Sequence, residues 1–332
     1  MVNVRISHLL LVGWTLACTS AAASPPSTAA RATTTLFDMQ SNFWVNLHHF
    51  LYATARARRG LDAGRATITQ SLADTSGAGT LSPAMRADWD AALAYYDRAV
   101  AERDILFDSS LVVVNDVLTN VRGPSLRETT LDTALVRALE QAAPGYRAVW
   151  WPRHDAANRR WIAAVLPLLA QHGDSAAAWE ARIFGGAWAK EPVRVDVTAY
   201  ANWAGAYTTE MPSHITIASL NEDTRGTAAF EILFHEVLHT MDGPLLERYR
   251  SAARAAGKRP LRNPTHPFIF YTAGEVTRQL FPGHVPYAKA VGLWTRVPDM
   301  RAMLPLLERS WQSWIADGTT LDAALRRIAV EL

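Results

Sequence analysis

Two histidines and a glutamate in one short stretch have the residue types and spacing of a metal site. The stretch is His235-Glu236-Val237-Leu238-His239, with its histidines four residues apart. On a helix this spacing places both imidazoles on one face, about one turn apart, so both can reach a single metal ion. Glu236 would then lie beside the metal, where it can take a proton from metal-bound water. The stretch therefore predicts hydrolysis by a metal-activated water.

The predicted helix around these residues, 227–242, is strongly apolar. It contains Phe230, Leu233, Phe234, Val237, Leu238 and Met241. Burying two imidazoles and a carboxylate among such side chains requires compensation, which a metal ion provides. Zinc accepts nitrogen and oxygen ligands in tetrahedral geometry, and a catalytic zinc keeps three protein ligands and one water. We therefore expect Zn²⁺ as the cofactor and a third ligand elsewhere in the chain.

The metal-binding stretch resembles the zincin metallopeptidases. The resemblance rests on His235, Glu236 and His239 and on the order of strands followed by a helix across residues 193–281. It implies a peptide or protein substrate and Glu236 as the general base. It also implies that an edge strand before the helix binds an extended substrate, which would place residues 206–209 or 214–218 along the cleft. An ordinary structural hairpin is the alternative for these strands.

The third ligand decides the subclass of zincin. The extended metzincin pattern needs glycine three and histidine six residues after His239, where this chain has Asp242 and Leu245. The gluzincin-like subclass instead supplies a glutamate from a second helix, and Glu275 lies 36 positions beyond His239 among small and apolar neighbours. The resemblance therefore favours Glu275 as the third ligand, although Gln279 replaces an acidic residue common in that subclass.

Three other residues are candidates for the third ligand. Asp242 shares a helix face with both histidines and is better placed to orient one of them. Glu247 lies in a polar pattern typical of a solvated face. His266 precedes Pro267 at the predicted helix start, and the nine residues between it and Glu275, at about 1.5 Å each, keep the two from binding one metal.

The reaction also needs a donor for the developing oxyanion. Tyr271 lies one turn before Glu275 on the same predicted face, and Arg278 nearly one turn after it. His266 is a third candidate. We expect Tyr271 or His266 ahead of Arg278, while packing or surface pairing is the alternative for each. Adjacent His48 and His49 point about 100 degrees apart on a helix and are interpreted as packed histidines, with one of them lining the cleft as the alternative.

Three functional classes fit these residues. They are a zinc peptidase, a zinc hydrolase of a non-peptide amide or ester, and an inactive binding protein with a structural zinc. A structural zinc needs no general base, so Glu236 argues for turnover. The predicted function is therefore a zinc-dependent metallopeptidase.

The fold expected from hydropathy patterns is mainly α with a small β-region (α+β). Helical patterns cover residues 37–59, 82–107, 125–142, 145–169, 175–183, 227–242, 267–281, 298–315 and 321–332. Short alternating runs at 193–197 and 214–217 predict a small antiparallel sheet. The expected organisation is a helical region over 36–190, followed by a zincin-like metal-binding catalytic domain over 191–332.

The first residues predict export. Arg5, an apolar stretch from Leu9 and the small residues up to Ala23 form a signal peptide over 1–23, followed by a flexible tether over 24–35. Cys18, the single cysteine, would be removed with it; lipidation at Cys18, giving a lipid anchor, is the alternative. A periplasmic or secreted protein is expected either way, without an integral membrane span.

The charge of the chain argues against nucleic acid as a partner. Its 33 Lys and Arg residues and 31 Asp and Glu residues give a net charge of +2. Binding a polyanion requires a strong positive field, which this balance does not supply.

Overall fold

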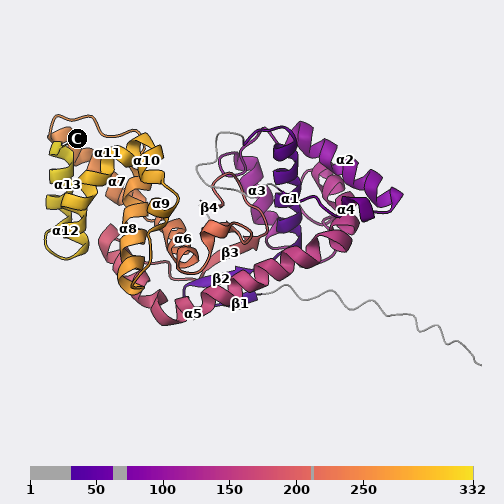
Figure 1. Ribbon diagram of the computed structural model, residues 1–332. Coiled ribbons are helices and arrows are strands. Elements are labelled where there is room, and N and C mark those ends of the chain that lie inside the picture. Colours follow the sequence, from indigo (N-terminus) through magenta and orange to yellow (C-terminus); the bar gives the residue numbers. More distant parts are fainter. Residues whose placement is uncertain (1–30, 63–72, 211–212, 332) are drawn as a thin grey trace, which may run out of the picture.

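The computed structural model describes residues 31–62, 73–210 and 213–331 (Figure 1). The predicted signal peptide and Cys18 lie outside these residues. Two helical lobes stand on either side of a small sheet, and one long helix, α5, runs beneath both of them. No helix in the described ranges combines the length and apolar character that crossing a membrane requires.

The sheet is mixed and has the strand order β1-β2-β3-β5-β4. Its described strands are β1 (Arg31–Thr33), β2 (Phe37–Gln40), β3 (Val193–Thr198), β4 (Ala206–Thr209) and β5 (His214–Ala218). β2 pairs with β3, and β3 with β5, in parallel, whereas the two outer pairs are antiparallel. β4 is therefore an edge strand.

The N-terminal lobe is built between β2 and β3, since a parallel pair needs a long crossover. Its helices are α1 (Phe43–Arg58), α2 (Pro83–Ala99), α3 (Ser109–Leu118) and α4 (Thr133–Val149), with a short 3₁₀ turn at Ala78–Thr80. Stacked Trp89 and Trp150, with ring centroids 4.4 Å apart, lie in its buried core. α5 (Trp151–Phe184) then leads back to β3.

The C-terminal lobe follows the sheet. Its elements are a 3₁₀ turn at Glu222–Thr224, α6 (Thr227–Leu238), α7 (Asp242–Ala255), α8 (Thr265–Leu280), α9 (Tyr287–Ala290), α10 (Leu293–Arg296), α11 (Pro298–Leu306), a π-helical segment (Leu307–Trp311), α12 (Gln312–Ile315) and α13 (Leu321–Glu331). A single apolar core joins these helices to α5 and to one face of the sheet.

The alternation of side chains along β3 and β5 gives the sheet two buried faces. Val195 and Ile215 point into the core of the C-terminal lobe, whereas Asp196 and Thr216 point toward the N-terminal lobe. Both faces are covered by helices, with α5 and α6 on one side and α1 on the other. The result is a three-layer arrangement in which the sheet joins the two lobes.

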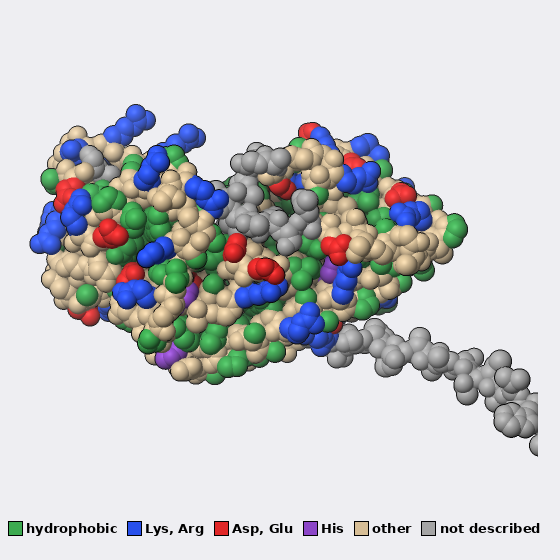
Figure 2. Space-filling view, in the orientation of Figure 1, with side chains coloured by type: hydrophobic (Ala, Val, Ile, Leu, Met, Phe, Trp, Pro, Cys, Tyr) green, Lys and Arg blue, Asp and Glu red, His purple; other side chains and the backbone are tan. Residues whose placement is uncertain are grey.

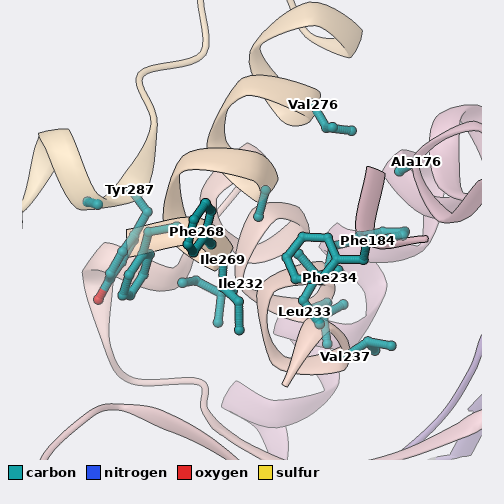
Figure 3. Packing of buried hydrophobic residues seen from close by; sticks show 14 of the residues in the cluster. Ala176, Phe184, Ile232, Leu233, Phe234, Val237, Phe268, Ile269, Val276 and Tyr287 are labelled. Carbon is teal, nitrogen blue, oxygen red and sulfur yellow. The ribbon is translucent and has the colours of Figure 1, made fainter. Parts of the chain in front are cut away.

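Packing among α5, α6 and α8 fixes the helix predicted to bind metal (Figure 3). Phe234 of α6 points toward Phe184 of α5, and Phe268 and Ile269 of α8 pack over α6. Gly274 allows α8 to approach α6 and the segment before α9 closely, because a Cβ there would lie 3.2 Å from Oε1 of Glu231 and 2.8 Å from Cβ of Pro286. The two helices are thus held together by close apolar contact.

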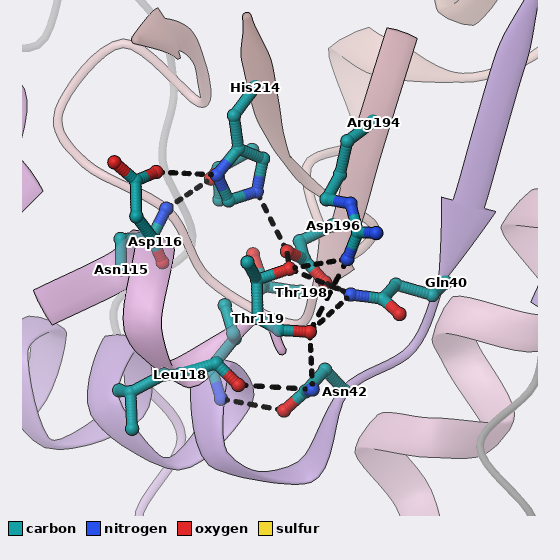
Figure 4. A network of polar contacts seen from close by, with 12 residues as sticks. Gln40, Asn42, Asn115, Asp116, Leu118, Thr119, Arg194, Asp196, Thr198 and His214 are labelled. Atoms are coloured by element: carbon teal, nitrogen blue, oxygen red, sulfur yellow. Dashed lines mark hydrogen bonds and ion pairs between the residues drawn. The ribbon is translucent and has the colours of Figure 1, made fainter. Parts of the chain in front are cut away.

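A buried polar network joins the N-terminal lobe to the sheet (Figure 4). Nε2 of His214 lies 2.7 Å from Oδ2 of Asp196, and Nδ1 lies 3.4 Å from Oδ1 of Asp116 on α3. Gln40 of β2 donates to Asp196 over 2.7 Å, and Thr119 donates to the same carboxylate. Both imidazole nitrogens of His214 therefore face carboxylates, as a protonated ring requires.

The surface has no single sign of charge on the face drawn in Figure 2. Basic and acidic side chains are interspersed over both lobes there. This distribution agrees with the near-neutral balance of the sequence. It supplies no concentrated positive field on that face.

Several expectations about the elements were wrong. The sheet is mixed rather than antiparallel, because β2 enters it beside β3. Residues 37–40, predicted as the start of a helix, form β2, and residues 31–33 of the predicted tether form β1. Helical patterns at 145–169 and 175–183 belong mostly to one helix, α5, which continues through Gly173. α3 and α7 were not predicted.

The two apolar cores do not meet at the expected boundary between residues 190 and 191. Phe37, Met39 and the residues of α5 from Trp161 onward that are buried and apolar belong to the core of the C-terminal lobe. Tyr207 and Ala218 belong to that of the N-terminal lobe. The chain therefore crosses between the cores more than once. The sheet, rather than a linker, separates them.

His214 should make stability depend on pH. Burial lowers its pKa, but hydrogen bonds with Asp116 and Asp196 outweigh burial and raise the pKa from 6.5 to about 9. A raised folded-state pKa stabilises the fold fully below the unfolded pKa, and this contribution is lost as pH rises to about 9. Urea denaturation between about pH 6 and pH 9.5 should show this loss, on the order of 3 kcal/mol.

The Asp116→Asn variant provides the comparison. Removing one carboxylate should lower the folded-state pKa of His214, so the variant should be less stable near neutral pH and lose less on going to high pH. Curves of unfolding free energy that run parallel for wild type and variant would contradict this role of His214.

Candidate metal centre

Three histidines from two helices converge in the C-terminal lobe. His235 lies in the last turn of α6, His239 caps its C-terminus in helical geometry, and His266 lies in the first turn of α8. One ligand atom from each lies within 4.8 Å of the others. Among the described residues, this is the group of histidine, aspartate and glutamate side chains that could hold a metal ion.

The three imidazoles are suited to a cation because burial keeps them neutral. Burial lowers the pKa of His235 well below 6.5, lowers that of His239 to about 3, and lowers that of His266. A neutral imidazole retains the lone pair that a metal needs. Nδ1 of His235 is buried without a hydrogen-bond partner in the described structure, and a bound cation would compensate such an unused polar group.

Phe270 forms an apolar wall of this group. Its ring centroid lies 4.0 Å from that of His235 and 5.9 Å from that of His266, and it follows His266 by one turn of α8. It also stacks on Tyr287 with centroids 6.1 Å apart. The ring restricts the orientations of two histidines and excludes water from one side of the site.

Glu236 lies beside the histidines as the sequence predicted. It is only 5% exposed, and Thr208 Oγ1 donates to its Oε2 over 2.7 Å. Burial raises the pKa of Glu236 to about 7, against the opposing effect of the Thr208 hydrogen bond. A carboxylate whose pKa is near neutrality can both take up and release a proton at physiological pH.

A cavity of about 600 Å³ opens over the site, and both lobes line it. His235, Glu236, His239 and His266 form part of its wall. Leu106, Phe107 and Trp203 line the side nearest the N-terminal lobe, and Leu293, Val297 and Met300 the side nearest the C-terminal helices. The ring of Phe107 is 74% exposed, which leaves an apolar surface free at this cavity. This size and mixture of groups are typical of a ligand site.

Glu275, the expected third ligand, is not brought to the histidines. It lies nine residues after His266 on α8, which corresponds to half a turn of rotation and places it on the opposite face of the helix. There its carboxylate forms an ion pair with Arg278, with Oε2 and Nη2 2.6 Å apart. The structure therefore does not bring Glu275 to the site. Of the candidates considered for the third ligand, His266 is the one that lies with His235 and His239.

The predicted oxyanion donors on α8 are also turned away from the cavity. The hydroxyl of Tyr271 donates to Oε1 of Gln312 over 3.1 Å, and its ring packs on Trp294. Arg278 pairs with Glu275. Neither Tyr271 nor Arg278 lines the cavity, so both are corrected to packing or surface roles. His266, the third candidate, does reach the cavity, among the candidate ligands.

The remaining candidates are placed as follows. Asp242 begins α7 and lines the cavity, where Thr265 provides a hydrogen bond to its carboxylate. Glu247 is solvated and pairs with Arg254, as its polar neighbours indicated. His48 and His49 are fully buried, with Nδ1 of His48 2.7 Å from the hydroxyl of Tyr96. The interpretation of these two as packed histidines is confirmed.

Three residues of the site were missed in the sequence. Phe270 could have been found from its one-turn spacing after His266, had the face of α8 been known. Thr208 lies in a predicted strand, but only the placement of β4 beside α6 brings its hydroxyl to Glu236. The backbone N–H of Tyr287 donates to Oε2 of Glu231 over 2.8 Å and so places Tyr287 at the cavity. No local sequence pattern indicates this contact.

Metal binding should depend on His266 and not on Glu275. The loss of a ligand should weaken zinc binding in His266→Ala by more than the about 10- to 100-fold typical of outer-shell changes. Glu275→Ala should keep wild-type affinity, since it removes an ion pair with an exposed arginine worth at most about 1 kcal/mol. Competition with a chromogenic chelator, with metal analysis of the purified proteins, measures both. Zinc lost in Glu275→Ala but kept in His266→Ala would restore Glu275 as the ligand.

Comparisons with known proteins identified no relative of this chain. No protein-family model matches the chain, and no curated protein and no solved structure matches it. The function is therefore inferred from the chemistry of the site.

Proposed function

We propose that this chain is a zinc-dependent hydrolase of peptide bonds. The observation that carries the proposal is the convergence of three neutral imidazoles beside a buried glutamate at the wall of a large cavity. His235, His239 and His266 would hold the metal, and three protein nitrogens match the ligand number of a catalytic zinc. A zinc ion held there would polarise a carbonyl and lower the pKa of bound water.

Glu236 would act as the general base. It follows a proposed ligand directly, and burial gives it a pKa of about 7. The carboxylate would take a proton from the attacking water and pass it to the leaving amine. Thr208 would hold the carboxylate in place, because its hydroxyl donates a hydrogen bond to Oε2 of Glu236.

The edge strand β4 would bind the substrate. β4 pairs on one side with β5, and its Ala206, Tyr207 and Thr208 line the cavity. An edge strand can add an extended peptide through its free backbone groups. This supports the position of residues 206–209 along the cleft that the resemblance to zincins implied, and it links substrate binding to the base through Thr208.

Tyr287 would stabilise the developing oxyanion in place of Tyr271. It is buried and lines the cavity, and burial raises the pKa of its phenol so that the hydroxyl stays protonated. A protonated phenol in a site of low polarity is an effective hydrogen-bond donor to a negative oxygen. Its position is set by the bond from its backbone to Glu231 and by stacking on Phe270.

Removing the base should abolish turnover without removing the metal. In Glu236→Gln we expect kcat/KM on a mixed peptide library to fall by about 100- to 10,000-fold, because general-base catalysis is lost, while bound zinc is unchanged. Mass spectrometry of the cleaved peptides and metal analysis provide the two readouts. Zinc binding without peptide cleavage by wild type would instead indicate a non-peptide amide or ester as the substrate.

Thr208 provides a second test with a matched control. Thr208→Val keeps the shape but removes the hydroxyl, so the carboxylate loses its orientation and kcat should fall about tenfold. Thr208→Ser retains the hydroxyl and should remain near wild type. Equal activities for the valine and serine variants would contradict a role for this hydrogen bond.

A further inference from the structure

Among the described residues that line the cavity, several are acidic and none is lysine or arginine. In addition to Glu236, its described lining contains Glu210, Asp242 and Asp299, and no lysine or arginine. These three carboxylates come from different elements: Glu210 follows β4, Asp242 begins α7, and Asp299 lies in the first turn of α11. A cavity lined by one sign of charge concentrates ligands of the opposite sign.

Glu210 and Asp242 line the same cavity. Burial and then the negative charge of Glu210 raise the pKa of Asp242 to about 6. Thr265 and then Arg250 oppose this effect, but Arg250 does not line the cavity. Asp299 accepts a hydrogen bond from the backbone of Asn263 over 3.3 Å. Within the described lining, no lysine or arginine neutralises Glu210 and Asp242.

The rest of the cavity suits a cation carried on an apolar stem. Leu293, Val297 and Met300 offer an apolar wall on the side where Asp299 lies. His235, which is 3% exposed and has a buried nitrogen without a hydrogen-bond partner in the described structure, also lines this cavity. A peptide bound at the carboxylates would therefore lie beside the proposed metal. Lysine and arginine combine a charged head with an aliphatic stem that packs on apolar surface.

On the basis of the proposed peptidase function, we infer that Glu210 and Asp242 form a substrate subsite for an ammonium or guanidinium group. The cation would lie at the carboxyl end of β4, on the His239 side of the metal centre. A lysine or arginine side chain near the scissile bond would bring its head to these carboxylates and lay its stem along the apolar wall. A free amino terminus presents the same charge without the stem.

Binding to an inactive protein separates this subsite from turnover. The zinc-loaded Glu236→Gln protein would be titrated with acetylated, amidated peptides that differ only in one lysine, norleucine or glutamate, and with the uncapped norleucine peptide. The lysine peptide should bind about five- to tenfold more tightly than the capped norleucine peptide, the effect of one partly exposed charge pair. The glutamate peptide should bind most weakly. Tighter binding of the uncapped peptide would identify the amino terminus as a second source of the cation.

Glu210→Gln and Asp242→Asn, each added to this protein, should remove the preference for lysine. Glu247→Gln on the exposed face of α7 is the matched control and should keep the preference. Glu210 is exposed, so its variant should fold even if Asp242→Asn does not. Equal binding of the capped lysine, norleucine and glutamate peptides, or a preference that survives in Glu210→Gln, would overturn the subsite. Failure of wild type to cleave peptides that this protein binds with the lysine preference would overturn the proposed function alone.

Discussion

The close packing of α8 on α6 determines where the imidazoles meet. His235 and His239 are placed by one helix, but the third nitrogen depends on which residue of α8 reaches that face. Apolar contact involving Phe268 and Ile269, together with the close approach at Gly274, fixes the position of α8, so His266 and Phe270 face the site and Glu275 faces away. The same packing excludes water, which lowers the pKa values of the histidines and leaves their lone pairs available.

A second constraint comes from the sheet. β4 lies beside α6, so Thr208 can hold Glu236 while the free edge of the strand lines the cavity. The strand is fixed to the rest of the sheet through β5, whose other side pairs with β3 and carries His214 into the polar network with the N-terminal lobe. The strand that holds the proposed base and offers the proposed substrate edge is thus connected through β5 to the junction between the lobes.

Local patterns in the sequence predicted the parts of the site that local geometry determines. The four-residue spacing of His235 and His239 and the position of Glu236 required only a helix, and alternation in residues 193–197 and 214–217 correctly indicated two strands. The third ligand could not be predicted in this way, because nothing within α8 says which of its faces meets α6. The pattern of a known subclass favoured Glu275, whereas tertiary packing brings His266 to His235 and His239. Thr208 and Tyr287 likewise depend on contacts between distant segments.

The most direct test of the account is the coordination of the metal itself. X-ray absorption spectroscopy on the full chain loaded with one equivalent of zinc counts the ligands and identifies imidazole by its outer-shell scattering. We expect three imidazole nitrogens and one oxygen, at about 2.0–2.1 Å, in tetrahedral geometry. Two imidazoles with a carboxylate, or zinc that does not bind stoichiometrically, would contradict the claim that His235, His239 and His266 form a catalytic metal centre.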